Sequence, residues 1–340
     1  MNLKIKKHWI FIIVLVLFLF FLWGLALDYY WQISATIKEA ILVKVGQPTG
    51  TILPRGLDGK MVYKKNINLR PVAAVIDNYP DGRPPEGLER ASIIYETIIE
   101  GEVTRYLAIF DYNELPNKIG PIRSARPIFI DWAAEWDAVM LHCGGSPEAM
   151  AILKKGKVKN INEYSVDGRY FWRDSDRGAP HNLFISDKLI EHAFQAKEIE
   201  IAADFMPWIF KDNLEVKNRP IDAADILIDN FVNLYNVRYH YQRAENYYER
   251  FLGYEPHLSA SGKLLIANNV VVQHVQHKVL DREGRLWIQT TGKGAAEIYQ
   301  DGQEIRGYWE NESGRTRFYD EGGNEIKFNR GVVWIEVVFD

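Results

Sequence analysis

The sequence predicts an α+β protein, with a mixed α/β first domain and a mainly antiparallel β second domain behind one N-terminal transmembrane helix. Three observations predict this class. A run of nineteen uncharged residues lies near the N-terminus, over 9–27. Short apolar runs alternate with helix-period segments over 66–212, and strand-like runs separated by glycine turns fill 221–340. With 340 residues, the chain is long enough for each domain to bury its own core.

The N-terminal segment has the charge pattern of a signal-anchor. Residues 1–8 carry three lysines and no acid, and the uncharged run over 9–27 follows directly. At about 1.5 Å per residue, that run is close to the thickness of a hydrocarbon core. Positive charge before the span orients the N-terminus to the cytoplasm. We therefore expect a cytoplasmic tail at 1–8 and a single-pass protein of the cell membrane, whose ectodomain lies outside the cytoplasm.

A cleaved signal peptide is the alternative, with Gly24 and Ala26 as the small residues before the cut. The apolar cores of signal peptides run to about 7–15 residues, and this core is longer, which favours the uncleaved anchor. Both interpretations export residues 28–340. Residues 28–65 are predicted to be a linker, because Gly and Pro interrupt regular structure there.

Composition excludes several classes of protein. A formal net charge of −4, without a basic stripe, argues against a nucleic-acid binder. The lone cysteine, Cys143, excludes an internal disulfide framework and a Cys-rich zinc site. No P-loop, HExxH, EF-hand or GxSxG triad motif is present. We therefore expect no metal and no cofactor, and the sequence contains no recognised catalytic motif.

The predicted first domain begins with a buried strand at Val72–Ile76, which ends at Asp77. Two β-rich runs, Ser92–Ile99 and Val103–Phe110, are joined by a short turn and predict a hairpin. Trp172–Ser186 is a charged loop by composition. These elements predict a small sheet with polar groups where its strands end.

Helices are expected in the second half of this domain. One begins near Pro127, which suits a first helical turn. Its apolar residues recur on one face: Ile128, Phe129, Trp132, Ala133 and Trp136. A strand at Ala138–His142 follows, and Ser146 is placed to cap the next helix. A last helix is expected at Lys188–Ile201.

The predicted second domain is nearly all strand. Turn pairs such as Asp301-Gly302 and Gly322-Gly323 recur at short intervals, as in a β-meander or small barrel. The predicted strands are Val237–Gln242, Tyr247–Leu252, Leu264–Gln276, Leu286–Thr290, Ala295–Gln300, Arg306–Trp309, Thr316–Tyr319 and Val332–Val338.

Several long phrases carry a family resemblance. In the first domain they are RPVAAVIDN (70–78), YETIIEGEVTRYLAIF (95–110), KIGPIRSARP (118–127), HCGGSPEA (142–149) and APHNLF (179–184). In the second they are NNVVVQHVQHKVLD (268–281) and TRFYDEGGNEIKFN (316–329). Together the phrases resemble the YerB-like lipoproteins of Gram-positive bacteria, whose domains carry no assigned activity. The resemblance implies an exported protein with a mixed first domain and a mainly β second domain.

The chain departs from this family in two places. The usual lipid-modified cysteine is absent and a membrane span takes its place. The position of Cys143 is more often a small residue in the family, which argues against a nucleophilic role. The resemblance implies no catalytic mechanism.

The segment from Arg123 to Ser146 is the best candidate for a binding site. Arg123 and Arg126 flank Ser124 directly before a predicted helix, and guanidinium groups at a helix N-terminus suit phosphate or carboxylate. The full predicted ligand-binding set is Arg105, Arg123, Ser124, Arg126, Ser146 and Asn182. The structural alternative is that these arginines pair with acids and hold the domain together, and the acids in question are Asp77, Glu96 and Glu100.

Acid–base catalysis is a second hypothesis. A neutral imidazole beside a carboxylate serves as a general base, and the candidates are His142 or His181 with Asp77 or Glu96. Each histidine alone is more often a satisfied structural residue. His142 would not activate Cys143, because adjacent side chains on a strand point to opposite faces.

Two functions therefore remain open. The absence of a catalytic motif favours a binding or accessory protein of the cell envelope, which recognises an anionic ligand such as a wall polymer, or an envelope protein. The alternative is an envelope hydrolase or transferase, in which the arginines stabilise a developing negative charge.

Overall fold

The computed structural model describes residues 22–31, 50–230 and 232–340. The chain divides into two compact units, one up to Thr51 and one from Ile52 to Asp340. In the first unit, residues 22–31 are helical. Among the described residues, no helix is long and apolar enough to span a membrane. The predicted tail at 1–8 and most of the predicted span over 9–27 lie outside the described residues, so the anchor stays a prediction.

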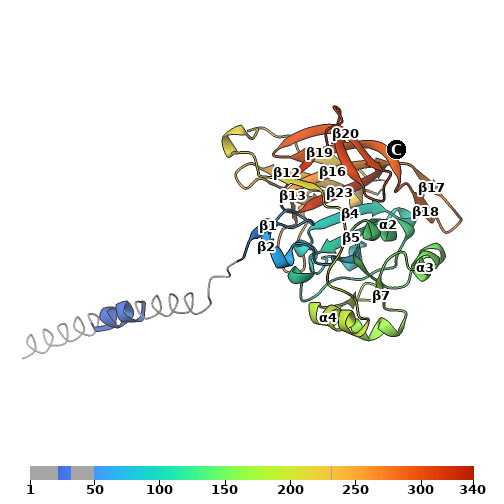
Figure 1. The fold of residues 1–340 in the computed structure, drawn as a ribbon, viewed down its shortest axis with the longest axis horizontal. Helices are drawn as coiled ribbons and strands as arrows, with labels where there is room; N and C mark the ends of the chain where they lie inside the picture. The colour runs from blue at the N-terminus through green and yellow to red at the C-terminus, as the bar shows by residue number, and fades with distance from the viewer. Residues whose placement is uncertain (1–21, 32–49, 231) are drawn as a thin grey trace, which may run out of the picture. The chain divides into compact units, whose positions relative to one another are not determined.

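The unit from Ile52 is built on one ten-stranded sheet with few helices (Figure 1). In spatial order its strands are β21 (Arg317–Asp320), β20 (Gln303–Asn311), β19 (Gly292–Gln300), β16 (Asn269–Val275), β23 (Val333–Phe339), β4 (Ile93–Ile98), β5 (Thr104–Phe110), β3 (Val72–Asp77), β6 (Val139–His142) and β7 (Asn160–Asn162). Three α-helices pack beside it, α2 (Pro127–Glu135), α3 (Pro147–Lys154) and α4 (Asp187–Ala196).

Smaller sheets complete the fold. A five-stranded sheet contains β11 (Ile226–Ile228), β12 (Val237–Gln242), β13 (Tyr247–Leu252), β14 (Glu255–Pro256) and β15 (Ile266–Ala267). The two-stranded pairs are β1 (Ile52–Pro54) with β2 (Met61–Tyr63), β8 (Trp172–Arg173) with β9 (Leu183–Phe184), β10 (Ile209–Lys211) with β22 (Lys327–Asn329), and β17 (His277–Val279) with β18 (Leu286–Ile288).

The large sheet joins the N-terminal and C-terminal regions. The last strand, β23, lies between β16 and β4 and runs parallel to both. Val333 is opposite Ile93 in β4 and opposite Asn269 in β16. The predicted meander is present as the antiparallel strands β19, β20 and β21. The fold is therefore a two-domain mixed α+β fold in which one sheet is continuous across both regions.

Each face of the central strands contributes to a different core. Successive side chains of a strand point to opposite faces, so Val75, Tyr95 and Leu107 lie in one hydrophobic cluster while Ile76 and Ile94 lie in the other. Helix α2 covers the first face. Helix α4 and the five-stranded sheet cover the second. Because both faces are covered, β3, β4 and β5 are buried along their whole length.

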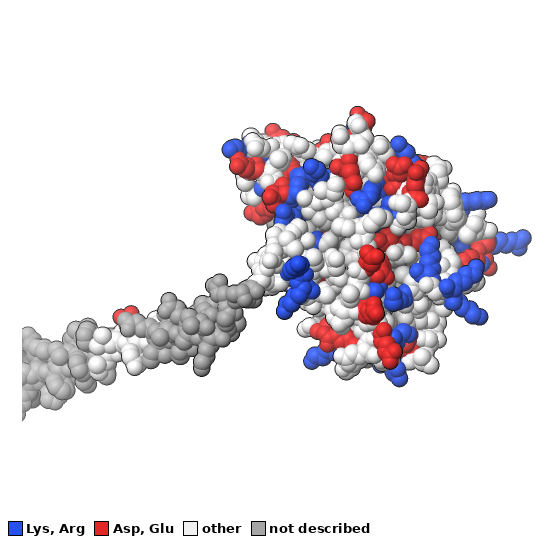
Figure 2. All heavy atoms as spheres, in the orientation of Figure 1, with Lys and Arg blue, Asp and Glu red and all other residues white. Residues whose placement is uncertain are grey.

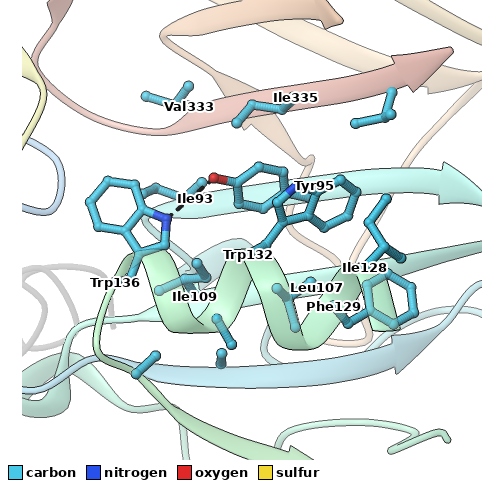
Figure 3. Close-up of a cluster of buried hydrophobic side chains, with 14 of the residues drawn as sticks. Ile93, Tyr95, Leu107, Ile109, Ile128, Phe129, Trp132, Trp136, Val333 and Ile335 are labelled. Atoms are coloured by element: carbon cyan, nitrogen blue, oxygen red, sulfur yellow. Dashed lines mark hydrogen bonds between the residues drawn. The ribbon is translucent and has the colours of Figure 1, made fainter. Parts of the chain in front are cut away.

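Helix α2 has the predicted buried face. The Trp132 ring stacks on the Tyr95 ring with centroids 4.5 Å apart, and Trp136 Nε1 donates to Tyr95 Oη at 3.2 Å (Figure 3). Ile128 and Phe129 are buried on the same side. The helix ends at Glu135, one residue before Trp136, which remains fully buried as the C-cap. Arg126 is the N-cap residue of this helix, directly before Pro127.

Candidate functional site

A pocket of about 360 Å³ lies where the N-termini of α2 and α3 meet. Ala125 N–H donates to Gly144 O at 3.0 Å, and Ser146 N–H donates to Ala125 O at 3.2 Å. These bonds hold the two helix starts side by side. Ser146 also caps α3 as predicted, accepting the Ala149 N–H at 3.3 Å. The lining residues are Glu100, Ser124, Arg126, Gly145, Ser146, Glu283 and Arg285.

The pocket brings together three residues of the predicted binding set, Ser124, Arg126 and Ser146. Its second guanidinium, from Arg285, was not predicted. Arg285 follows the turn between β17 and β18, more than a hundred residues away in sequence, and no local pattern places it here. We call this feature the Arg126–Arg285 pocket.

Both guanidinium groups of the pocket have carboxylate partners. Arg126 makes a two-pronged ion pair with Glu100. Arg285 contacts Asp281 at 2.6 Å, Glu148 at 3.5 Å and Glu283 at 3.7 Å. Burial, and then the charge of Arg285, lowers the pKa of Arg126 below its ordinary value. A guanidinium still stays charged at neutral pH, so two like charges face each other across the pocket.

Arg123 lies in a second cluster, with Asp77 and His181. The His181 ring nitrogen Nδ1 is 2.6 Å from Asp77 Oδ2, and Arg123 Nε is 3.3 Å from the same oxygen. The Tyr79 ring stacks on the imidazole with centroids 5.0 Å apart, and the Tyr79 N–H donates to Asp77 Oδ1 at 3.0 Å. Asp77 is buried and the His181 side chain is 13% exposed. A carboxylate oxygen accepts, so Nδ1 carries the hydrogen of this contact.

Arg105 is buried beneath this second cluster on β5. Its Nη1 donates to Ser124 O at 3.0 Å, while its Nε has no hydrogen-bond partner among the described residues. Burial, and after it the charge of Arg123, lowers the pKa of Arg105, and Asp77 opposes that shift. Arg105 supports the loop that carries Ser124 and does not line the pocket.

The structural alternative, in which the arginines pair with acids of the same domain, agrees with the contacts that Arg123 and Arg126 make. Arg123 pairs with Asp77, and Arg126 pairs with Glu100. Asn182 is also a supporting residue, because its side chain accepts from Arg173 at 3.1 Å and donates to Asp174 O at 3.2 Å.

His142 does not join His181. Its Nδ1 is 2.7 Å from Gly144 O and its Nε2 is 3.2 Å from Asn160 Oδ1. Burial lowers the pKa of the imidazole, so His142 is a neutral, fully engaged residue that supports the turn before α3. The neighbouring thiol of Cys143 donates to Glu163 at 3.3 Å, and burial raises its pKa. A raised pKa is the opposite of what a thiolate nucleophile needs.

Glu96 belongs to a buried charge network that sequence reasoning did not find. Arg250 pairs with Glu96 and lies 3.3 Å from Glu336 Oε1, which also accepts Tyr239 Oη at 2.5 Å. His257 Nδ1 accepts from the same guanidinium. A single charge inside an apolar strand is the available signal, as in the run VWIEVVF around Glu336. The network ties β4 to β13 and β23 and is a structural feature.

In the part of the chain that the structure describes, no group of three or more His, Cys, Asp or Glu side chains is arranged to hold a metal ion.

Comparison with known proteins places the chain in a family. Residues 57–200 match the model of the N-terminal domain of a protein of unknown function (DUF3048), and residues 228–335 match the C-terminal domain of the same family. The "Putative lipoprotein YerB" of Bacillus subtilis (strain 168) is 30% identical over 320 residues, which cover 93% of this chain and 94% of that protein. The crystal structure of the B. subtilis YerB protein is similar with a TM-score of 0.77, covering 84% of this chain and 96% of that chain. Family models match both regions of the chain, and the chain belongs to the DUF3048 family.

Proposed function

We propose that this chain is a membrane-anchored extracytoplasmic binding or accessory protein that recognises an anionic ligand in the Arg126–Arg285 pocket. The location is supported by the uncharged run over 9–27 and by the word lipoprotein in the name of the B. subtilis relative. The observation that carries the binding proposal is the pocket, where two guanidinium groups from distant parts of the chain meet at two helix N-termini.

An anion in this pocket gains from three features of it. The first turn of a helix leaves N–H groups without intrahelical partners, and the helix dipole adds partial positive charge there. Arg126 and Arg285 present planar donors that match phosphate or carboxylate oxygens. An anion between them offsets the repulsion from Arg285, which adds to burial in lowering the pKa of Arg126. Such a ligand competes with Glu100 for Arg126 and with Glu283 for Arg285.

The test is a titration of the full chain in detergent micelles with inorganic phosphate and with a dicarboxylate, followed by calorimetry. Arg126→Gln and Arg285→Gln are each expected to weaken binding about tenfold to a hundredfold, since a charged hydrogen bond contributes roughly 1.5–3 kcal/mol and 1.4 kcal/mol is tenfold. Arg306→Gln is the matched control, because Arg306 is a highly exposed arginine that pairs with Glu304 and does not line this pocket. Unchanged affinity in both pocket variants would rule the pocket out as the binding site.

The Asp77–His181 pair favours a second candidate function, a hydrolase or transferase of the envelope. A carboxylate that accepts from Nδ1 orients the imidazole and leaves Nε2 free to take a proton from water or a hydroxyl. Arg123, 3.3 Å from the same carboxylate oxygen, supplies positive charge close to the imidazole.

Turnover of a panel of ester, phosphodiester and glycosidic substrates tests this candidate. If a substrate is found, His181→Gln is expected to lower kcat about a hundredfold or more, and Asp77→Asn to lower it as well. His192→Gln is the control, because His192 is an exposed histidine on α4. Equal turnover by the His181 variant and the wild type would remove the dyad from the chemistry.

A further inference from the structure

The end of α3 and the turn after it form a surface rich in lysine. The run KKGKVK at 154–159 contains four lysines, and no Asp or Glu occurs anywhere from 149 to 162. All four lysines are exposed. One lysine in the last turn of a helix complements its dipole, but four exceed that need. We call Lys154, Lys155, Lys157 and Lys159 the α3 lysine surface.

Most of these charges have no counter-ion. Lys157 pairs with Asp131 at 2.6 Å. Lys154, Lys155 and Lys159 make no ion pair within the described part of the chain. The hairpin of β17 and β18 adds two more exposed cations in the same condition, Lys278 and Arg282. Figure 2 shows Lys and Arg side chains gathered where α3 and this hairpin lie in Figure 1.

Four acids surround the two guanidinium groups of the pocket. Glu100 pairs with Arg126. Glu148, Asp281 and Glu283 all contact Arg285. With Asp131 and Glu102, six acids face eight cations on this side: the two guanidinium groups, the four lysines, Lys278 and Arg282. This side of the molecule is therefore net positive, although the whole chain carries a formal charge of −4. Sequence reasoning found no basic stripe because the surface combines one short run with a distant hairpin.

The lysine surface continues from the wall of the Arg126–Arg285 pocket. Glu148 in the first turn of α3 contacts Arg285. Residues seven apart lie on the same face of a helix, so Lys155 follows Glu148 along that face. The eight residues of α3 extend over about 12 Å at 1.5 Å per residue. Basic side chains are thus present near both ends of one short helix.

We propose that the ligand is a linear polyanion, with one anionic group in the pocket and the following groups along α3 on the lysine surface. This inference rests on the proposed function of the pocket. Lysine is a compact charge on a flexible stem, which suits successive groups of a mobile chain better than one fixed geometry. The concave pocket favours a chain with a seated group over a flat layer of lipid headgroups, for which the lysines alone would suffice.

The experiment compares orthophosphate, triphosphate and long-chain polyphosphate as probes of the full chain in nanodiscs of neutral lipid. Affinity is expected to rise with chain length. The triple variant Lys154→Gln, Lys155→Gln, Lys159→Gln is expected to bind the long chain about tenfold more weakly or worse, with orthophosphate binding unchanged. Its slope of log K against log salt is expected to be smaller by about 2, at roughly 0.7 per neutralised charge. The control carries the same charge change on exposed lysines elsewhere: Lys64, Lys188 and Lys263.

The outcomes separate the two proposals. If the pocket variants have no effect while the triple variant loses polyphosphate, the pocket proposal fails and the lysine surface stands alone as the polyanion site. If affinity is independent of chain length, or the triple variant matches its control, the polyanion proposal is overturned. If the triple variant keeps polyphosphate binding but no longer recruits phosphatidylglycerol vesicles, the surface faces a membrane and the proposal is wrong.

Discussion

Arg250 is the residue on which the buried charge network depends. Its guanidinium is fully buried and faces two carboxylates, Glu96 and Glu336, and it also packs over the Trp334 ring at 4.3 Å from the centroid. One positive charge does not balance two negative charges where water is excluded, so one carboxyl group keeps its proton. Burial, and then the charge of Glu96, raises the pKa of Glu336 from its ordinary 4.5 to about 8. Glu336 is therefore the protonated member at neutral pH.

The substitution Glu336→Gln tests this assignment, because glutamine resembles the protonated acid. We expect the variant to match the wild type within about 1 kcal/mol near pH 4 and to be more stable than the wild type at pH 7. The pKa of Glu336 is higher in the folded state, so the wild type gains stability from the bound proton at low pH. It loses that stability as pH rises from about 4.5 to 8, by up to about 1.4 kcal/mol per pH unit. Urea unfolding at several pH values should show the loss in the wild type and not in the variant.

Removing Arg250 should instead destabilise the protein. Arg250→Met leaves Glu96 without its counter-ion in the interior, and breaking a buried pair in this way costs about 3–5 kcal/mol. The contrast between the two variants is the informative result. If Glu336→Gln destabilised the protein as much as Arg250→Met at pH 7, Glu336 would be ionised there and the assignment would be wrong.

At the scale of elements, local sequence patterns predicted the features that depend on interactions between residues close in sequence. The buried face of α2, the Ser146 cap of α3 and the hairpin of β4 and β5 all follow from spacing within a few residues. The predicted strand at Leu264–Gln276 was too long, because Asn268 interrupts it and its side chain accepts the Val332 N–H at 2.9 Å. That bond joins segments 64 residues apart, and no local pattern contains it.

The candidate site shows the same difference between residues that local patterns predict and residues that long-range contacts bring together. The sequence predicts Arg126, Ser124 and Ser146 as binding residues because they lie at helix starts, which local sequence patterns identify. It could not supply Arg285, which reaches the pocket from a hairpin of the C-terminal region. It also could not decide which histidine meets a carboxylate, because the 2.6 Å contact between His181 and Asp77 joins residues 104 positions apart.

For the molecule from Ile52 onwards, the position of β23 is the decisive feature of the fold. The two family domains are separate in sequence, yet β23 comes from the end of the chain and pairs with β4 near its beginning. Its side chains enter both cores, with Val333 and Ile335 on one face and Trp334 on the other. Charge pairs add to this junction, because Arg250 from the C-terminal domain meets Glu96 from the N-terminal domain.

This arrangement predicts that the N-terminal region does not fold alone. A fragment of residues 52–220 lacks β23, so β4 becomes an open edge and Glu96 loses its buried partner Arg250. The side chains Val333, Trp334, Ile335 and Val337 are buried in the whole protein, and burying each one contributes about 1.5–3 kcal/mol to its stability. The sum of these contributions is comparable to the total stability of a domain.

We expect the fragment to show weak near-ultraviolet circular dichroism and the dye binding that is typical of loose packing. It should recover native spectra when it is refolded with residues 221–340. Cooperative unfolding and a well-dispersed amide spectrum of the fragment alone would show instead that the sheet joins two independently stable domains.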